Sequence, residues 1–482
     1  MILGWSEGFH DAAAAVIDYD GNILFASHSE RFSGKKHEKF ISPELKEYID
    51  CNFDITRKTF YERPFIKKTR QLYAGQYSHV FSKRQMCWKP DSVWPHHLSH
   101  AAAAFQTSEY DNAVAVVVDA IGEWDCTSIW SCDYLPNGKV RYIKEWSMTY
   151  PNSIGLWYTA LTAFVGLRPL DEEYIFMGMA AYGKTHDKFL RDVLNELLEG
   201  NHNLHKGVPA RFKKDLDGYK SEDIAAVAQE IIEVKLIKVF TKAKEYGSNF
   251  VYGGGVALNC VANSKLAKFV DNKLWIMPNP GDAGGALGAA CLEYGRRVKW
   301  KGPYLGYFIS PTKSKRMLVN DIVNHLEQEG MCGIAWGEAE YGPRALGNRT
   351  LCADPRGPKV KDLVNTVKRR QKFRPFAPAV LEEYAAEYFE GADTLSPYMQ
   401  QVYNCLKPNE LPAIVHQDGT SRVQTVGKKD KTILRAVLEE WYKRTGCPVL
   451  LNTSLNIRGE PMVNDRGTAD RFEQLYNVKV FY

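Results

Sequence analysis

Apolar residues gather in two stretches of the chain in a pattern that predicts short strands joined by tight turns. In each stretch a two-residue turn pair, Asp20-Gly21 or Asn137-Gly138, precedes the last strand. Such pairs between short apolar runs are typical of β-hairpins. Two copies of this unit, each followed by helical sequence, are what an actin-like, two-lobed fold requires. The predicted strands cover residues 1–5, 12–17 and 23–26 in the first stretch and 113–119, 127–132 and 140–143 in the second.

A long amphipathic helix is predicted between Ser221 and Gly247. A serine followed by two acidic residues is a helix start signal, apolar residues then recur at helical spacing, and a glycine is typical of the helix end. A short strand at 250–252 then runs into glycines and a further helix. The same arrangement returns at 274–277, with a helix predicted from Gly284.

The character of the chain changes near Gly302, where Pro303, Gly306 and Pro311 indicate a boundary. From residue 331 onward strand and helix patterns again alternate. The pattern therefore predicts two α/β domains, at 1–301 and 302–482. A chain of 482 residues is long enough for each domain to bury its own core.

Composition indicates the broad class of protein. Hydrophobic residues make up 45% and charged residues 25% of the chain, as in ordinary globular proteins. The apolar runs are far shorter than the roughly 18 residues of a membrane helix, and no leader-like sequence begins the chain. We therefore expect a cytoplasmic protein without a membrane segment. The ten cysteines contain no C-x-x-C pair, which does not indicate a disulfide framework or a cysteine zinc site.

Charge is unevenly distributed. The whole chain carries a formal net charge of +5, but residues 35–89 alone carry 13 Lys and Arg against 6 Asp and Glu. Two interpretations remain open: a basic surface for nucleic acid, or a solvated lid over a small-molecule site. Aromatic residues are interleaved with these charges at Phe60, Tyr61, Phe65, Tyr73, Tyr77, Phe81 and Trp88.

Three of the twelve histidines lie within five residues, at His96, His97 and His100. On a helix, His96 and His100 share one face, so both imidazoles can bind one cation. The alternative is a pair of ordinary surface or core histidines. The neighbouring residues are needed to choose between these two interpretations.

Two aspartates follow predicted strands, Asp119 at the end of an apolar run and Asp282 in a strand-to-helix turn. Each alone could be a helix N-cap. With two imidazoles they form a mixed nitrogen and oxygen set that suits iron, manganese or zinc. Near them, the run from Tyr252 to Asn259 contains three successive glycines. Its backbone amides could approach a phosphate, or the glycines could simply form a tight turn.

At this point the sequence resembles the NodU-type O-carbamoyltransferases of nodulation-factor and antibiotic synthesis. The resemblance runs nearly end to end and includes many motifs in the same order. They are Gly8-Phe-His-Asp11, Ser29-Glu-Arg-Phe32, His96-His-Leu-Ser-His-Ala101, Glu173-Tyr174, Met177-Gly-Met-Ala180, Gly253-Gly-Gly-Val-Ala-Leu-Asn259, Gly281-Asp-Ala-Gly284, Glu340-Tyr-Gly-Pro-Arg-Ala-Leu-Gly-Asn-Arg349, Phe373-Arg-Pro-Phe-Ala-Pro378, Asp418-Gly-Thr-Ser-Arg-Val-Gln424 and Asn452-Thr-Ser-Leu-Asn456.

The resemblance implies a fold and a set of site residues. The first domain is similar to the ASKHA-class threonylcarbamoyl-transfer proteins, a duplicated RNase H-like fold, and the C-terminal domain resembles YrdC proteins. The resemblance makes four residues metal ligands: His96, His100, Asp119 and Asp282. It places three residues beside the nucleotide: Gly254, Gly255 and Asn259.

The second domain carries residues that suit carbamoyl phosphate, because a small dianion needs fixed cations and hydroxyl or amide donors. Lys368 and Arg370 with Ser454 and Asn456 resemble the YrdC pattern. Without the resemblance, the cluster at 368–370 would be a solvated helix face. Further candidate ligands are Arg344, Arg349, Arg374 and Arg422.

The resemblance implies an ATP-dependent reaction, with Mg on the ATP, in which carbamoyl phosphate becomes carbamoyl adenylate and the carbamoyl group moves to a hydroxyl. His10 is the candidate base, although it could equally be a histidine at a strand end. Two other classes share parts of this sequence: RNA-modifying threonylcarbamoyl transferases and non-enzymatic actin-like nucleotide-binding regulators. Carbamoyl phosphate dependence would separate them.

The basic segment bears on the identity of the acceptor hydroxyl. The basic, aromatic segment 35–89 favours 5-hydroxymethylcytosine in DNA, with Lys67, Lys68 and Arg70 against the phosphates. The alternative is a free sugar, antibiotic or nucleoside acceptor with the segment as a lid.

Overall fold

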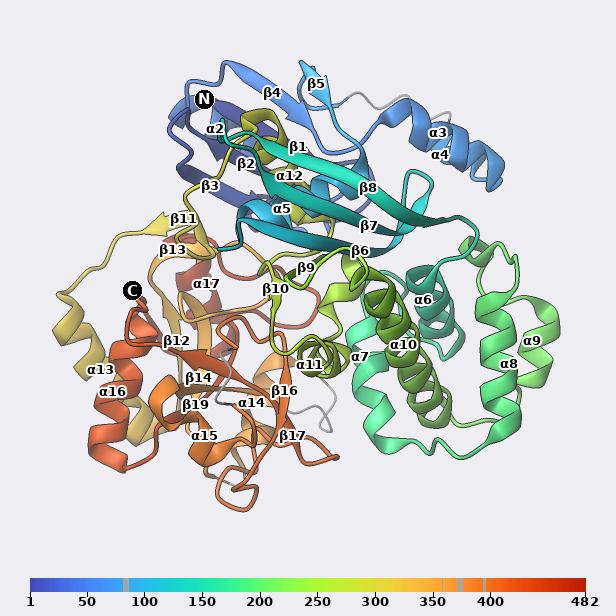
Figure 1. Ribbon diagram of the computed structural model, residues 1–482. Helices are drawn as coiled ribbons and strands as arrows, with labels where there is room; N and C mark the ends of the chain where they lie inside the picture. The colour runs from blue at the N-terminus through green and yellow to red at the C-terminus, as the bar shows by residue number, and fades with distance from the viewer. Residues whose placement is uncertain (81–85, 358, 371–375, 393–395) are drawn as a thin grey trace. The chain divides into compact units, whose positions relative to one another are not determined.

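The computed structural model describes residues 1–80, 86–357, 359–370, 376–392 and 396–482. The chain divides into two compact units (Figure 1). Both units combine helices with β-sheet, so the predicted α/β class is confirmed. Unit 1 comprises Met1–Leu24, Lys39–Ile41 and Lys46–Trp300, and unit 2 comprises Phe25–Glu38, Ser42–Leu45 and Lys301–Tyr482.

The first sheet of unit 1 starts with the predicted N-terminal hairpin. Strand β1 (Ile2–Ser6) pairs antiparallel with β2 (Ala13–Ile17), and every residue of both strands is buried. On its other edge β1 pairs parallel with β4 (Arg57–Phe60), which pairs parallel with β5 (Ser92–Val93). Strand β3 (Ile23–His28) follows β2 in the chain and in the strand order, and its residues from Phe25 onward are assigned to unit 2.

The second sheet of unit 1 is built from longer strands. Strand β6 (Asn112–Gly122) pairs antiparallel with β7 (Asp125–Tyr134), which pairs antiparallel with β8 (Val140–Thr149). On the other side β6 pairs parallel with β9 (Phe250–Gly253), and β9 pairs parallel with β10 (Leu274–Ile276).

The two sheets share one topology. The strand order is β3-β2-β1-β4-β5 in the first sheet and β8-β7-β6-β9-β10 in the second. In each sheet, the first two strands in chain order pair antiparallel. The fourth strand pairs parallel with the first, and the fifth pairs parallel with the fourth. The strand orders agree at each position, and the pairing senses of β1, β2, β4 and β5 match those of β6, β7, β9 and β10. Unit 1 is therefore a duplicated RNase H-like fold, as predicted.

Helices α5 (His96–Gln106) and α12 (Asp282–Tyr294) pack against each other and against the first sheet. The contact is close because small residues line it: a Cβ at Gly288 would lie 1.8 Å from the Ser99 carbonyl oxygen, and one at Gly4 would lie 2.2 Å from that of Ala286. Close backbone approach is a main reason for glycine inside an element. This packing brings the start of α5 next to the start of α12.

The remaining helices of unit 1 cover the second sheet or connect the strands. The large apolar core beside this sheet is formed by α6, α8 and α10 with β6 and β9. The bounds are α2 (Pro43–Asn52, whose first residues belong to unit 2), α3 (Pro64–Tyr73), α4 (Tyr77–Val80), α6 (Ile154–Phe164), α7 (Glu173–Met179), η1 (Ala180–Tyr182), α8 (Lys188–Glu199), η2 (Leu204–Lys206), α9 (Ala210–Asp215), α10 (Ser221–Ala243), η3 (Gly255–Leu258) and α11 (Cys260–Phe269).

Several element boundaries differ from the sequence prediction. Helix α5 begins at His96, directly after Pro95, whose backbone is extended. Strand β6 continues to Gly122, so Asp119 lies inside it, at an irregularity in the pairing with β7. The long helix ends at Ala243 and not at Gly247.

Unit 2 is built on a six-stranded sheet of mixed sense, in the order β18-β15-β19-β14-β12-β20. Apolar clusters lie on both faces of it. The bounds are α1 (Ser29–Ser33), β11 (Tyr304–Ile309), α13 (Lys315–Glu329), β12 (Met331–Ala335), β13 (Gly337–Glu340), β14 (Arg349–Ala353), α14 (Val360–Lys368), β15 (Ala377–Leu381), η4 (Glu382–Tyr384), α15 (Ala385–Tyr388), β16 (Val402–Asn404), β17 (Thr420–Arg422), β18 (Gln424–Val426), α16 (Ile433–Thr445), β19 (Val449–Ser454), α17 (Arg466–Tyr476) and β20 (Val480–Phe481).

All ten cysteines are free thiols. Among the described residues, no helix combines the length and the apolar character that crossing a membrane requires.

Candidate functional site

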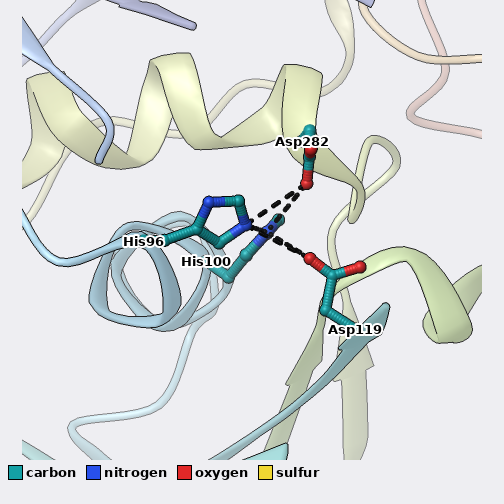
Figure 2. Close-up of side chains that lie close together, drawn as sticks. All are labelled: His96, His100, Asp119 and Asp282. Atoms are coloured by element: carbon teal, nitrogen blue, oxygen red, sulfur yellow. Dashed lines mark hydrogen bonds and ion pairs between the residues drawn. The ribbon is translucent and has the colours of Figure 1, made fainter. Parts of the chain in front are cut away.

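Helix α5 carries two buried imidazoles near its start. His96 is the first helical residue, and His100 follows one turn later. Their Nε2 atoms lie 3.0 Å apart and point toward the same place (Figure 2). The four-residue spacing therefore places both imidazoles on one face of the helix, as the sequence predicted.

Two carboxylates from separate elements meet these imidazoles (Figure 2). Asp119 comes from β6, and Asp282 is the first residue of α12, directly after the N-cap Gly281. His96 Nε2 lies 3.2 Å from Asp119 Oδ2 and 3.3 Å from Asp282 Oδ1. His100 Nε2 lies 3.5 Å and 3.4 Å from the same two oxygens. The fold thus brings all four predicted ligands together.

The spacing of these atoms fits a first-row metal ion. Bonds of about 2.1 Å place neighbouring ligand atoms about 3.0–3.4 Å apart, depending on the coordination geometry. The four ligand atoms all lie within 4.8 Å of one another, and the contacts between imidazole and carboxylate are near the expected spacing. Two nitrogens and two oxygens would suit iron, manganese or zinc.

Glycines make room for the imidazoles. A Cβ at Gly122 would lie 2.4 Å from the His96 ring and 2.5 Å from the His97 ring. A Cβ at Gly253 would lie 3.2 Å from the His100 carbonyl oxygen. The end of β6 can therefore approach the α5 imidazoles because Gly122 lacks a side chain, and Gly253 allows a close fit between β9 and α5.

Imidazoles and carboxylates of opposite charge face each other in this cluster. Burial alone would disfavour the charged forms, but the surrounding aspartates outweigh it and raise the pKa of His96 well above 6.5 and that of His100 above it. In the same way, burial is outweighed by the two histidines, which hold the pKa of Asp119 well below its usual range. A metal ion bound here would compete with protons for the two imidazoles, because a histidine ligand must be neutral.

His10 lies at the edge of this cluster. Its Nδ1 lies 2.9 Å from Asp11 Oδ2, and its Nε2 lies 3.9 Å from Asp282 Oδ2. Its side chain is 23% exposed, in contrast to the buried His96 and His100. Burial is outweighed by Asp11 and Asp282, so the pKa of His10 is raised above 6.5. An oriented, partly exposed imidazole beside a metal-type cluster can accept a proton from an incoming group.

The glycine run lies directly beside Asp119. Gly254 has φ +88°, and a Cβ there would lie 2.3 Å from the Val118 carbonyl oxygen. The amide of Gly255 donates to Asp119 Oδ1 at 3.2 Å. Asn259 caps α11 by accepting from the Ala262 amide, and its side chain also bonds to Gln229. Both interpretations of the run, a tight turn and a phosphate-approaching loop, are compatible with this geometry.

In unit 2 the predicted Lys368, Ser454 and Asn456 converge. Lys368, the last residue of α14, is buried, and its ammonium donates to Ser454 Oγ at 3.0 Å and to Asn456 Oδ1 at 2.7 Å. Ser454 ends β19 and donates to Asn456 Oδ1 at 2.7 Å. Arg370 donates to Asn365 Oδ1 and lies 3.8 Å over the Phe376 ring. Because Lys368 is buried, it is not part of a solvated helix face, which was the alternative interpretation of the sequence.

The other predicted arginines differ in their surroundings. Arg422 ends β17, and its buried Nε has no hydrogen-bond partner within the described part of the chain. Arg344 is half-buried in the loop after β13. Arg374 lies outside the described residues.

Arg349 is fully buried and serves the fold. Its guanidinium donates to the backbone carbonyls of Tyr307, Trp336, Gly337, Asn348 and Asn464. Burial lowers its pKa to about 10, because the guanidinium has lost its contact with solvent. A guanidinium bonded to five backbone carbonyls stabilises the fold, and the role of Arg349 toward a substrate stays a prediction.

The basic segment 35–89 does not form one uniform surface. Residues up to 38 and 42–45 belong to unit 2, and the others belong to unit 1. Arg70 is buried and donates to the Glu123 carbonyl and to Gln76. Lys67 pairs with Glu62, while Lys68 is exposed. Of the aromatic residues, Phe60, Tyr61 and Trp88 are core residues, Phe65, Tyr73 and Tyr77 are exposed, and Phe81 lies outside the described residues.

The sequence did not single out Glu62, which lies against His96. It follows β4, and its Oε2 lies 3.5 Å from His96 Nδ1. Its position in the sequence could have indicated this role. Glu62 follows β4, which pairs parallel with β1, and residues that follow parallel strands gather at one edge of the sheet.

Comparison with known proteins identifies the family. Residues 43–291 match the family model described as carbamoyltransferase N-terminus, and residues 323–481 match carbamoyltransferase C-terminus. The chain is 31% identical to an uncharacterised protein of Synechocystis sp., over 96% of this chain and 92% of the relative. It is 30% identical to the nodulation protein NolNO of Sinorhizobium fredii, over 94% of this chain and 75% of the relative.

Among solved structures, a similar one is the ADPNP-bound activator of the 2-hydroxyisocaproyl-CoA dehydratase from Clostridium difficile. It has a TM-score of 0.34 and 13% identity, and the match covers 61% of this chain and 94% of the activator. With a duplicated RNase H-like unit and matches to both family models, the chain belongs to the carbamoyltransferase family. It is a carbamoyltransferase.

Proposed function

We propose that this protein is an ATP-dependent O-carbamoyltransferase with two chemically distinct parts. Residues 302–482 would convert carbamoyl phosphate and ATP into carbamoyl adenylate. Residues 1–301 would transfer the carbamoyl group from the adenylate to an acceptor hydroxyl. The observation that carries the proposal is the convergence of His96, His100, Asp119 and Asp282 beside the glycine run, in a chain of this family.

The activation step is supported by the cluster around Lys368. Carbamoyl phosphate is a small dianion, and Lys368, Ser454 and Asn456 form a compact set of one cation with hydroxyl and amide groups. Arg370 and Arg422 would add positive charge, and the unpartnered Nε of Arg422 is a donor for an anionic group. Arg344 and Arg374 remain further proposed ligands.

The atoms balance in two stages. Carbamoyl phosphate loses its phosphoryl group to water and gives carbamate and inorganic phosphate. A carbamate oxygen attacks the α-phosphorus of Mg-bound ATP, forms carbamoyl adenylate and expels pyrophosphate. The acceptor oxygen then attacks the carbamoyl carbon, the bond to AMP breaks, and the hydroxyl proton leaves. The products are the carbamoylated acceptor and AMP.

The transfer step is assigned to the cluster in unit 1. His96, His100, Asp119 and Asp282 would hold iron, manganese or zinc, and a bound divalent ion supplies positive charge that polarises a phosphate or carbonyl oxygen. His10 would accept the hydroxyl proton at Nε2, because Asp11 orients the ring through Nδ1. Gly254, Gly255 and Asn259 would lie beside the nucleotide, where glycine backbone can approach a phosphate.

The function is tested by incubating the protein with ATP, carbamoyl phosphate and candidate acceptors, followed by mass spectrometry for one added carbamoyl group. We expect product only when carbamoyl phosphate is present, with AMP and pyrophosphate formed. His100→Ala should lower transfer by about 100-fold or more, because it removes a metal ligand. His186→Ala, at an exposed histidine of the same unit, is the matched control.

Other outcomes would favour the alternative classes. Product formed from bicarbonate and threonine without carbamoyl phosphate would indicate an RNA-modifying threonylcarbamoyl transferase. Nucleotide binding without turnover of any acceptor would indicate a regulator. Release of ADP in place of AMP would exclude an adenylate.

For the acceptor we propose 5-hydroxymethylcytosine in DNA. The support is a set of exposed residues on α3 and α4: Lys68 with Phe65, Tyr73 and Tyr77, whose exposed fractions are 75%, 70% and 60%. Exposed rings offer stacking faces for an unstacked base, and lysine neutralises phosphate. Helix α3 also carries Lys67, which pairs with Glu62, and Glu62 lies beside His96, so the helix with the exposed face also contacts a residue next to the metal-type cluster.

This acceptor proposal requires transfer to hydroxymethylcytosine-containing DNA that falls steeply with added salt. The triple variant Lys68→Ala, Tyr73→Ala, Tyr77→Ala should weaken DNA binding without changing adenylate formation. The control is Lys188→Ala with Phe189→Ala, a similarly exposed pair on α8. Turnover of a free sugar, antibiotic or nucleoside, with none of such DNA, would replace the acceptor and leave the carbamoyltransferase assignment intact.

A further inference from the structure

The second ring nitrogen of His96 faces a carboxylate. His96 directs Nε2 toward His100, Asp119 and Asp282, whereas its Nδ1 lies 3.5 Å from Glu62 Oε2. Nδ1 is buried and makes no hydrogen bond among the described residues. The side chains of Glu62 and His96 are only 4% and 3% exposed. Water therefore has little access to either group.

A ligand histidine needs a defined tautomer. If Nε2 binds a metal, the proton must be on Nδ1, and metal-bound histidines usually donate that N–H to a carboxylate, carbonyl or water. A buried N–H without an acceptor costs about 1–3 kcal/mol. Glu62 Oε2 is in position to accept it after a small rotation of either side chain. The Tyr61 ring, 5.0 Å from the His96 ring between centroids, restricts how far the imidazole can turn.

Lys67 holds the other oxygen of the same carboxylate. Its ammonium donates to Glu62 Oε1 at 2.7 Å. The lysine side chain is itself only 13% exposed and lies 5.6 Å from the centre of the Phe9 ring. A buried carboxylate is unfavourable unless it is paired. Lys67 thus supplies the charge that keeps Glu62 in this buried position, and it leaves Oε2 for His96.

We propose that Glu62 is a positioning residue that fixes the tautomer and ring orientation of His96 for metal binding, and that Lys67 orients Glu62. The inference rests on the proposed role of His96 as a metal ligand. It adds two residues, from the end of β4 and from α3, that touch neither metal nor substrate. The alternative is an ion pair that serves only the stability of the fold.

Metal affinity separates the two roles. We would prepare the metal-free full chain and measure Zn²⁺ affinity by competition with a chromophoric chelator, together with the visible spectrum of bound Co²⁺ as a report on ligand arrangement. Glu62→Leu should weaken Zn²⁺ binding about 10- to 100-fold. Glu62→Gln, whose amide oxygen can still accept, should lose less. Lys67→Met should weaken binding, and Lys67→Arg should restore it.

A control removes an ion pair between β4 and α12 without touching His96. Glu293 on α12 accepts from Arg57 on β4, and this pair is more exposed than the pair of Lys67 with Glu62. The control variant is Glu293→Gln. It should leave Zn²⁺ affinity and the Co²⁺ spectrum unchanged. Urea unfolding of each metal-free variant reports any general loss of stability, and if Glu62→Leu does not fold, Glu62→Gln and Lys67→Met carry the test.

The outcomes distinguish this inference from the function on which it rests. Weakened Zn²⁺ binding and a changed Co²⁺ spectrum in the Glu62 variants, with Glu293→Gln unchanged, support it. If the wild type binds Zn²⁺ and His100→Ala abolishes binding, but the Glu62 and Lys67 variants bind normally, the positioning role is overturned and the metal site stands. If His100→Ala binds Zn²⁺ as the wild type does, the metal site and this inference both fail.

Discussion

At the scale of single residues, the site depends on glycines as much as on the four predicted ligands. His96, His100, Asp119 and Asp282 provide the donor atoms, but Gly122 and Gly253 let two strands approach α5 closely enough for those atoms to meet. Arg349 shows the opposite case: a residue type that suits phosphate is consumed by backbone carbonyls. Residue type alone therefore does not separate ligand from scaffold.

Gly122→Ala should displace the imidazoles. A Cβ would lie 2.4 Å from His96 and 2.5 Å from His97, so a ring or the strand must move. We expect a loss of about 1–3 kcal/mol in the free energy of unfolding of the metal-free protein, measured in urea, and a lower Zn²⁺ stoichiometry. Gly178→Ala on α7 is the control, because no atom outside its own helix lies within 4 Å of the added Cβ and alanine favours helix. Equal Zn²⁺ content in the wild type and Gly122→Ala would contradict the expectation.

At the scale of elements, α3 is fixed to unit 1 by its basic residues. Arg63, its N-cap, binds the Glu123 carboxylate, which also accepts from the Arg63 amide at 2.7 Å. Arg70, near its end, donates to the Glu123 carbonyl and to His205 Nε2 at 3.1 Å. These two charges, which belong to the basic segment 35–89, hold the helix beside the β6–β7 turn. The outward face of the helix is left for exposed aromatic rings.

The contact between Arg70 and His205 predicts an acid sensitivity. His205 must be neutral to accept from a guanidinium, and burial, followed by Arg70 and His79, lowers its pKa to about 4. Between pH 6.5 and 4 the unfolded chain binds a proton that the folded chain does not, so stability falls as pH falls through this window. Because the ring is partly exposed, the effect should be about 1–2 kcal/mol.

Urea unfolding at pH 7 and pH 4.5 measures this effect. His205→Gln can still accept from Arg70 but does not titrate, so its stability should depend less on pH than that of the wild type. His186→Gln, at an exposed histidine of the same unit, is the control. An identical pH dependence for the wild type and His205→Gln would show that Arg70 does not hold His205 neutral.

At the scale of the whole molecule, two units with separate cores carry the two groups of site residues. The metal-type cluster lies in unit 1 and the Lys368 cluster in unit 2. If each group performs its own step, damage to one should leave the other partial reaction intact. Carbamoyl-phosphate-dependent exchange of labelled pyrophosphate into ATP reports activation alone, whereas carbamoylated acceptor reports both steps.

His100→Ala should therefore retain pyrophosphate exchange within about twofold of wild type and lose transfer. Lys368→Met should lose both, because removing a buried ammonium also leaves Ser454 and Asn456 without their shared donor. Lys361→Met, at a lysine on the same helix, controls for charge on α14. Loss of exchange in His100→Ala would mean that the first unit takes part in activation.

The sequence by itself determined the elements and their duplication. Strand periodicity and turn pairs located the hairpins of both sheets, and the i, i+4 spacing placed His96 and His100 on one helix face, because these features depend on local backbone geometry. Ordered motifs determined the family and the residues of the cluster.

Only the tertiary structure decided which charges are used internally and which residues support the ligands. Arg349 and Arg70 became interior donors, and Glu62 came to face His96, because burial and pairing depend on elements distant in the chain. The length of β6, with Asp119 inside it, was set by pairing with β7 beyond the apolar run. Such partners cannot be predicted from the local sequence, because the desolvation of a side chain depends on how the whole molecule packs.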